Sequence, residues 1–190
     1  MIFTPVPIKG AFLIDIEPKE DDRGFFARLF CENEFRAAGI NPVFKQCNMQ
    51  HNAMKGTLRG LHLQFKPHAE EKLMQCTRGA VYDAIVDLRT HSLTYKQWFG
   101  VELNAENRRM IYIPKGVAHG YVTLTDNTET FYMVTEFYSP ECEWGVRFND
   151  PAFNIKWPDL GAFIISEKDR NWPMFGRSAA VVRPLKRKPI

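Results

Sequence analysis

Two short segments of the chain carry side chains that could act together in chemistry. The first, residues 56–80, contains His62, then Gln64 two positions later, and two glutamates further on. The second, residues 114–119, ends in His119. A transition metal needs three or four convergent nitrogen, oxygen or sulfur ligands, and a neutral amide such as Gln64 is a poor one. At the positions of the two metal-binding motifs, at most His62, His119 and one carboxylate remain, so we predict no metal ion here.

Without a metal, His62 is available for proton transfer. The unperturbed pKa of imidazole is about 6.5, which makes histidine a natural general base near neutral pH. Neighbouring residues of a strand point to opposite faces, so His62 and Gln64 should face one way and Leu61 and Leu63 the other. A histidine in a strand is also often a hydrogen-bonded core residue, and these residues alone leave both interpretations open.

Short strands must position these histidines. Between residues 40 and 150 the chain consists of segments rich in Val, Ile, Phe, Tyr and Thr, separated by turn formers. Such regular spacing of short strands predicts an all-β sandwich or barrel. The clearest segments are residues 72–79, 80–89, 98–104, 109–116, 118–124 and 128–140.

Helices are expected to be few and peripheral. The best candidate runs from Cys31 to Ala38, with Gly39 placed to end it. A second short helix is predicted near Ser166 to Asp169, within 40 C-terminal residues that are rich in Trp and Pro and otherwise irregular. The first 20 residues, interrupted by prolines and a glycine, predict short extended pieces.

Composition narrows the class of protein. A chain of 190 residues with 45% hydrophobic residues suits a single domain, residues 1–190, and the basic residues at about 177–190 suggest a flexible tail. A formal net charge of +3 provides no electrostatic signature for nucleic acid. We find no membrane span, no signal peptide and no cysteine spacing typical of zinc or disulfides. A cytoplasmic protein is the expectation.

The two histidine segments are spaced like the two motifs of a cupin, a small jelly-roll barrel. Several blocks extend the likeness, and the chain resembles the dTDP-4-dehydrorhamnose 3,5-epimerase family over nearly its whole length. This resemblance implies an all-β jelly-roll (cupin) barrel with a few short peripheral helices, no cofactor and a homodimer that exchanges N-terminal strands. The blocks are DDRGFF (21–26), LRGLHLQ (58–64), Lys72, AVYDAIVDLR (80–89), residues 101–124 with PKGVAHG, and NDPAFNIKWP (149–158).

The resemblance implies a reaction and its catalytic groups. The family inverts carbons 3 and 5 of dTDP-4-keto-6-deoxyglucose by proton abstraction beside the ketone. His62 matches the base, Asp169 the carboxylate that holds it and Tyr132 the acid on the opposite face. Lys72 matches the cation near the enolate oxygen. Taken alone, Asp169 could be a surface residue at a helix start, Tyr132 a core aromatic and Lys72 a solvated lysine.

Substrate-binding residues follow from the same resemblance. Arg23 and Arg59 match arginines that contact the diphosphate, where a guanidinium fork suits phosphate oxygens. As part of an exchanged N-terminal strand, Arg23 is expected to reach the partner's pocket. Taken alone, each arginine could instead form a surface salt bridge, which suits Arg23 better than Arg59, and each of the four nucleobase matches below is also an ordinary surface or core residue. The remaining matches are Phe26 in the DDRGFF block, His119 in the pocket, and Gln46, Asn48, Tyr138 and Glu143 at the nucleobase.

The chain departs from the family pattern near the nucleotide and sugar. Ala27 and Arg28 follow RGFF where a glutamate is usual, and Met133 follows Tyr132 where lysine is common. Residues 48–52 read NMQHN instead of N-H-S-x-S. The reaction type is therefore more secure than the substrate. Alternatives are an epimerase that inverts one centre of another nucleotide sugar and a non-catalytic nucleotide-sugar binder. A third alternative is a metal-dependent cupin oxygenase, which the presence of Gln64 disfavours.

Overall fold

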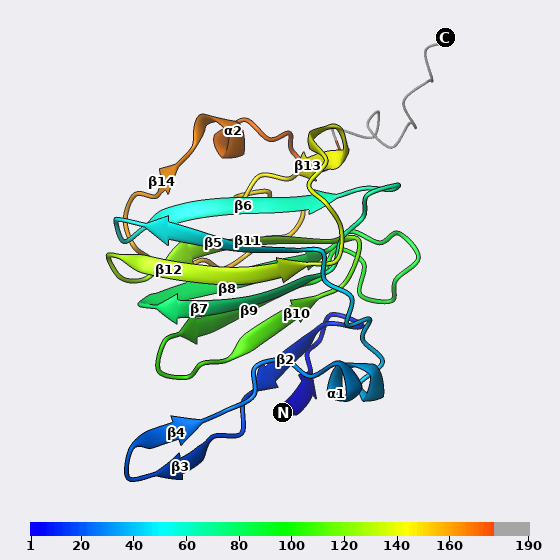
Figure 1. Cartoon of the computed structure of the whole chain (residues 1–190). Coiled ribbons are helices and arrows are strands. Elements are labelled where there is room, and N and C mark those ends of the chain that lie inside the picture. Colours follow the sequence, from blue (N-terminus) through cyan, green and yellow to red (C-terminus); the bar gives the residue numbers. More distant parts are fainter. Residues whose placement is uncertain (177–190) are drawn as a thin grey trace.

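The computed structural model describes residues 1–176, which form two antiparallel sheets that face each other (Figure 1). The first sheet has the strand order β1-β2-β10-β7-β12-β5. Its strands are β1 (Ile2–Pro5), β2 (Phe12–Asp15), β5 (Gln46–Asn52), β7 (Lys72–Arg78), β10 (Met110–Ile113) and β12 (Thr128–Val134).

The second sheet has the order β13-β6-β11-β8-β9, and β14 adds to β6 as a parallel neighbour. Its strands are β6 (Thr57–Gln64), β8 (Ala80–Asp87), β9 (Trp98–Asn104), β11 (Val117–Thr123), β13 (Glu143–Gly145) and β14 (Ile164–Ile165). The helices are α1 (Glu32–Ala37), the 3-10 turn η1 (Pro140–Cys142) and α2 (Glu167–Arg170).

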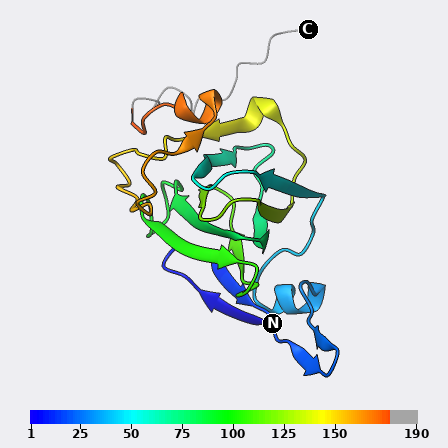
Figure 2. The ribbon, with the colours of Figure 1, turned by 90° about the vertical axis from the view of Figure 1, so that its left-hand side faces the viewer.

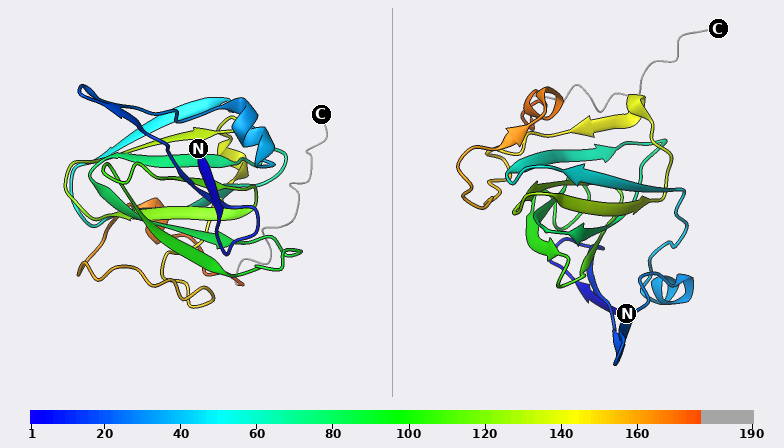
Figure 3. Two further views of the ribbon diagram at one scale, coloured as in Figure 1. Left: turned by 90° about the horizontal axis from the view of Figure 1, so that it is seen from below. Right: turned by 60° about the vertical axis from the view of Figure 1, so that its left-hand side comes forward.

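A small hairpin, β3 (Lys19–Asp21) with β4 (Gly24–Phe26), stands apart from both sheets. It projects from the lower end of the molecule in Figure 1, and both views of Figure 3 show the same projection. α2 lies at the opposite end, above β6, as Figure 2 also shows. The hairpin and α2 therefore occupy opposite ends of the chain's fold.

Strand alternation divides the apolar residues between three clusters. Side chains from both sheets fill the space between them, and α1 covers the outer face of the first sheet. Leu61 and Leu63 point to the outer face of the second sheet, where segment 146–155 covers them. The cluster between the sheets contains Ile8, Ala11, Met74, Cys76, Val81, Ile85, Leu103, Ile111, Ile113, Val117 and Tyr121.

The all-β prediction is confirmed, as are both helix positions. α1 ends as expected, with Gly39 at a positive φ of 77° just beyond its C-cap. Ser166 caps α2 by accepting a hydrogen bond from the Asp169 N–H. The pairing of β14 with β6 was not predicted, because a two-residue strand has no periodicity to read. The predicted basic tail lies outside the described residues, and no described helix has the length and apolarity of a membrane span.

A bulge between β6 and β11 sets the direction of the side chains that follow it. His119 pairs with His62, but Tyr121 pairs with Arg59, so β6 has one residue more than β11 over this stretch. The backbones come so close that a Cβ on Gly60 would lie 2.5 Å from the Gly120 Cα. Only glycine fits this approach, and Gly60 also has a positive φ of 117°.

We expect Gly60→Ala to lower the free energy of unfolding by about 2–4 kcal/mol, because the added methyl group both overlaps Gly120 and strains the backbone. Gly161→Ala is the control, since Gly161 also has a positive φ but no heavy atom lies within 4 Å of its added Cβ. It should cost about 1 kcal/mol. Urea unfolding of both variants measures the difference, and equal losses would contradict the close-approach explanation.

Candidate active site

A cavity of about 110 Å³ lies between the two sheets. The first sheet contributes side chains from β5, β7 and β12, the second from β6 and β11, and α2 closes one side. Four residues predicted from sequence as catalytic line this one cavity, together with two predicted as substrate-binding. The lining residues are Gln50, Arg59, His62, Lys72, Met74, His119, Gly120, Tyr121, Tyr132 and Asp169.

His62 and Asp169 form a hydrogen-bonded pair on the β6 side of the cavity. The His62 Nε2 lies 2.5 Å from the Asp169 Oδ1, and the imidazole keeps 27% of its side-chain surface exposed. Asp169 is almost fully buried, so the interpretation of Asp169 as a surface helix-start residue is wrong. The carboxylate also accepts hydrogen bonds from the Gly60 N–H and the Trp172 indole N–H.

Two opposing effects act on the Asp169 carboxyl. Burial favours the neutral acid, but the hydrogen bond and the positive charge of protonated His62, with the Gly60 and Trp172 donors, outweigh it. The pKa of Asp169 is therefore lower than its ordinary value. An ionised Asp169 holds the imidazole by its Nε2 and leaves the ring's other nitrogen for a further contact.

Tyr132 and Lys72 come from the first sheet, opposite His62. Burial, with the nearby Tyr121 and Glu70, raises the pKa of the Tyr132 phenol. The Lys72 ammonium lies 3.0 Å from the Glu70 Oε1, and both side chains are mostly buried. Lys72 is therefore a fixed cation at the cavity wall, contrary to the interpretation as a solvated lysine.

His119 is part of a second histidine and carboxylate pair. Its Nε2 lies 2.7 Å from the Asp83 Oδ2, and Asp83 is fully buried. The Asp83 Oδ1 has no hydrogen-bond partner within residues 1–176. The buried carboxylate orients the ring of His119 in the same way as Asp169 orients that of His62.

A network that the sequence did not predict holds Arg59 in place. The Asn52 Oδ1 accepts a hydrogen bond from the Arg59 Nε at 2.8 Å, and the Asn52 amide donates to the Tyr121 hydroxyl at 3.2 Å. That hydroxyl in turn donates to the Gln50 Oε1 at 2.8 Å. Two of the departures from the family pattern belong to this network: Gln50 lines the cavity, and Asn52 is buried behind it.

Gln64 does not line the cavity, although it shares a strand with His62. Its amide oxygen accepts from the Ser139 N–H at 2.6 Å, and its amide nitrogen donates to the carbonyls of His68 and Phe137. Strand alternation predicted that Gln64 faces the same way as His62, but only His62 lines the cavity. Gln64 ties two loops together at the end of β6.

A second group of polar side chains lies outside the cavity lining and links four elements. The Gln46 Oε1 accepts from the Tyr138 N–H, and the Tyr138 hydroxyl donates to the Glu143 Oε2, both at 2.8 Å. Lys168 donates to the same oxygen at 2.6 Å. Sequence reasoning missed Lys168, although it immediately precedes Asp169. Asn48 pairs in register with Tyr132 and lies two positions along β5 from Gln46.

Arg23 and Phe26 lie on the β3–β4 hairpin and do not join the cavity of their own chain. The Arg23 side chain is 89% exposed and pairs with Asp21. Phe26 is 68% exposed. Arg28 pairs with Glu34 at 3.0 Å, next to α1 and away from the cavity lining. Within one chain, the hairpin residues are therefore separate from the other predicted site residues.

Comparisons with known proteins agree on one family. A family model described as dTDP-4-dehydrorhamnose 3,5-epimerase matches residues 5–177. An enzyme of that name from Methanothermobacter thermautotrophicus is 40% identical over 99% of this chain and 96% of its own. The crystal structure of the Elizabethkingia anophelis enzyme, 40% identical, has a TM-score of 0.89 and covers 92% of this chain and 96% of that one. A Bacillus anthracis structure with TDP and PPi bound, 41% identical, has a TM-score of 0.87 over 91% and 98%.

The lowered pKa of Asp169 predicts a pH effect on stability. Because the folded-state pKa is below the ordinary 3.8, this carboxylate stabilises the fold above pH 3.8, and the contribution is lost as the pH falls through the lowered value. Asp169→Asn should reduce the free energy of unfolding at pH 7 and flatten its decline in acid. The exposed Asp159 provides the control Asp159→Asn. Urea unfolding at several pH values measures this, and parallel curves for Asp169→Asn and wild type would contradict the assignment.

Proposed function

This chain belongs to the dTDP-4-dehydrorhamnose 3,5-epimerase family, and we propose that its cavity epimerises a dTDP-linked 4-keto-6-deoxy sugar by removing and returning protons beside the ketone. The observation that carries the proposal is the position of His62 on the second sheet, with Asp169 of α2 beside it, and of Tyr132 on the first sheet, all lining one cavity. The B. anthracis relative, whose structure holds TDP, supports the nucleotide.

The chemistry requires a base and an acid on opposite faces of the sugar ring. A hydrogen beside a ketone is acidic because the enolate places negative charge on oxygen. If a base removes it from one face and an acid returns a proton from the other, the carbon is inverted. Residues from two facing sheets can meet this requirement without any motion of the backbone.

His62 is the proposed base. Asp169 fixes the orientation of the imidazole and stabilises the imidazolium that forms when it accepts a proton. A buried, ionised carboxylate is suited to this because it need not gain a proton itself. The 27% exposed surface of His62 leaves room for a substrate to approach the ring.

Tyr132 is the proposed acid. Its pKa is raised by burial, so the phenol keeps its proton at neutral pH and can donate it to a carbanion. Reprotonation by a phenol from the far side of the cavity gives inversion instead of return to the starting sugar.

Lys72 and His119 are the proposed stabilisers of charge on the substrate oxygens. A fixed ammonium near the developing enolate oxygen favours the transition state, and single donors of this kind contribute about 2.7–4 kcal/mol in other enzymes. Lys72 is held by Glu70, and His119 by Asp83, so neither group must be ordered during the reaction.

The nucleotide is proposed to bind to Arg59 and to the second group of polar side chains, which lies outside the cavity lining. Arg59, held by its hydrogen bond to Asn52, is proposed to bind the diphosphate through its guanidinium. Gln46, Asn48, Tyr138 and Glu143 are proposed to contact the nucleobase, and the hydrogen bonds that join three of them support a shared role.

A homodimer would bring the hairpin residues to the site. The β3–β4 hairpin exposes apolar side chains, with Phe26 at 68%, and an apolar hollow lined by Leu29, Met110 and Met133 lies on the first sheet. Exposed apolar surface of this kind is typical of an interface. We propose that each hairpin, with Arg23 and Phe26, docks at the partner's cavity. The cytoplasmic location stays a prediction.

The reaction is tested by incubation with dTDP-4-keto-6-deoxyglucose in heavy water, followed by NMR of the ring hydrogens. We expect deuterium at carbons 3 and 5. In Tyr132→Phe the base remains, so exchange should persist while the inverted product falls by about 10²-fold or more, since the acid is lost. In His62→Asn both exchange and inversion should disappear.

Other results would each decide against part of the proposal. Deuterium at one carbon alone would identify a single-centre epimerase. Wild-type product formation by Tyr132→Phe would show that Tyr132 only packs. No exchange by the wild-type protein with any nucleotide-linked keto sugar would favour the non-catalytic binder.

The position of Arg23 is tested by mixing two inactive subunits. If Arg23 acts at the partner's cavity, co-expressed Arg23→Ala and His62→Ala chains should regain about a quarter of wild-type activity, because half of the dimers are mixed and each has one intact site. If Arg23 acts within its own chain, neither site of the mixed dimer is intact. Activity that stays at the level of the separate variants would therefore contradict the proposal.

A further inference from the structure

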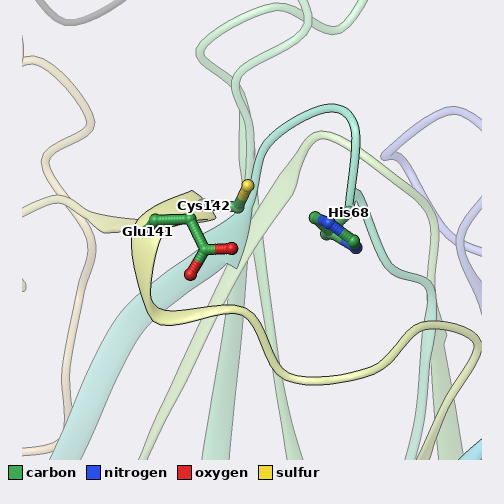
Figure 4. A group of neighbouring side chains, drawn as sticks. All are labelled: His68, Glu141 and Cys142. Carbon is green, nitrogen blue, oxygen red and sulfur yellow. The ribbon is translucent and has the colours of Figure 1, made fainter. Parts of the chain in front are cut away.

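Three side chains of the kinds that bind zinc lie together outside the catalytic cavity. They are His68, on the loop after β6, and Glu141 and Cys142 of η1. Their potential ligand atoms all lie within 4.8 Å of one another. Figure 4 shows the three side chains on two neighbouring segments, with His68 on one and Glu141 and Cys142 on the other. Within residues 1–176 this is the one such group of three.

The ligand types select a class of metal. Imidazole, thiolate and carboxylate are all zinc ligands, and a thiolate disfavours the hard cations magnesium and calcium. Three protein ligands leave a fourth tetrahedral position for water. Residues 177–190 contain no His, Cys, Asp or Glu, so they supply no fourth ligand.

The two segments are held next to each other by hydrogen bonds that do not involve the three side chains. The Phe65 N–H donates to the Cys142 carbonyl at 2.9 Å. Gln64, which is buried, accepts from Ser139 at 2.6 Å and donates to the His68 carbonyl at 3.0 Å. The backbone that presents the ligands is therefore in place before an ion binds, and only side-chain rotations are needed to close the site.

The carboxylate has a supporting contact of the sort that metal ligands commonly have. The Ser139 hydroxyl donates to the Glu141 Oε1 at 2.6 Å. A carboxylate oriented in this way by a hydroxyl needs less ordering when it binds an ion. His68 and Cys142 are both partly buried, so their side chains have fewer alternative directions than those of a surface loop.

We propose that His68, Glu141 and Cys142 bind one divalent transition-metal ion of the zinc type, with water as the fourth ligand. The proposal does not depend on the epimerase reaction, because none of the three lines the cavity. The metal site would lie next to the proposed nucleobase contacts, because Cys142 directly precedes Glu143 in the chain. The Glu143 carboxylate accepts hydrogen bonds from Tyr138 and Lys168. A bound ion would fix this turn to the loop after β6.

The test is titration of the chelator-treated full chain with Co²⁺, whose bond to a thiolate produces an intense charge-transfer absorption. We expect one equivalent to bind with this absorption, and Zn²⁺ to displace it. Cys142→Ser should abolish the absorption, and both Cys142→Ser and His68→Ala should weaken Zn²⁺ binding at least tenfold in calorimetric titration. The exposed Cys47 provides the control Cys47→Ser, which should behave as wild type.

Three results would overturn the proposal. They are no Co²⁺ absorption in the wild-type chain, a thiolate band that survives Cys142→Ser, and Zn²⁺ affinity unchanged in His68→Ala. Circular dichroism of each variant checks that the sheets remain folded. If the wild-type chain exchanges deuterium but binds no metal, only the metal-site proposal fails. If it binds metal but exchanges no deuterium, only the epimerase proposal fails.

Discussion

The close approach of β6 and β11 at Gly60 and Gly120 is the constraint on which the cavity depends. A regular strand would point Arg59 and His62, three positions apart, to opposite faces. The extra residue at the bulge turns both side chains toward the cavity. There His62 contacts Asp169, and Arg59 contacts Asn52. The Arg59 guanidinium and the His62 imidazole therefore line the same cavity because two glycines allow the backbones to come this close.

Most of the proposed proton-transfer groups and most of the proposed nucleotide contacts are on different kinds of element. The proposed proton-transfer groups other than Asp169 are on central strands of the two sheets, where paired backbones fix their positions. Of the proposed nucleotide contacts, Arg59 is on the inner strand β6, whereas the others are on β5 at a sheet edge, on the loop before η1, at the start of β13 and on the projecting hairpin. Recognition can change in such peripheral elements without moving the reacting groups. The departures at positions 50 and 52 are closer to those groups, because Gln50 lines the cavity and Asn52 is buried behind it.

The sequence predicted the strands and the faces of His62, Leu61 and Leu63 well, because these follow from periodicity alone. It predicted the partnership of His62 with Asp169 only through the family resemblance, since 107 positions separate them and no local pattern joins them. Asn52 and Tyr121 were missed because their importance comes from hydrogen bonds across three strands. The hydrogen bonds by which Gln64 connects two loops were not predicted, because they depend on a segment that strand alternation cannot locate.

The late position of Asp169 in the chain has a consequence for biosynthesis. Every described strand, including both strands that contain His62 and Tyr132, is translated before α2. A chain that stops short of Ser166 contains all fourteen described strands and still lacks the carboxylate that holds His62 and the cap that positions it. The residues for the sheets are therefore complete before the partner of the proposed base is made, so activity would report on complete synthesis and not on the strands alone.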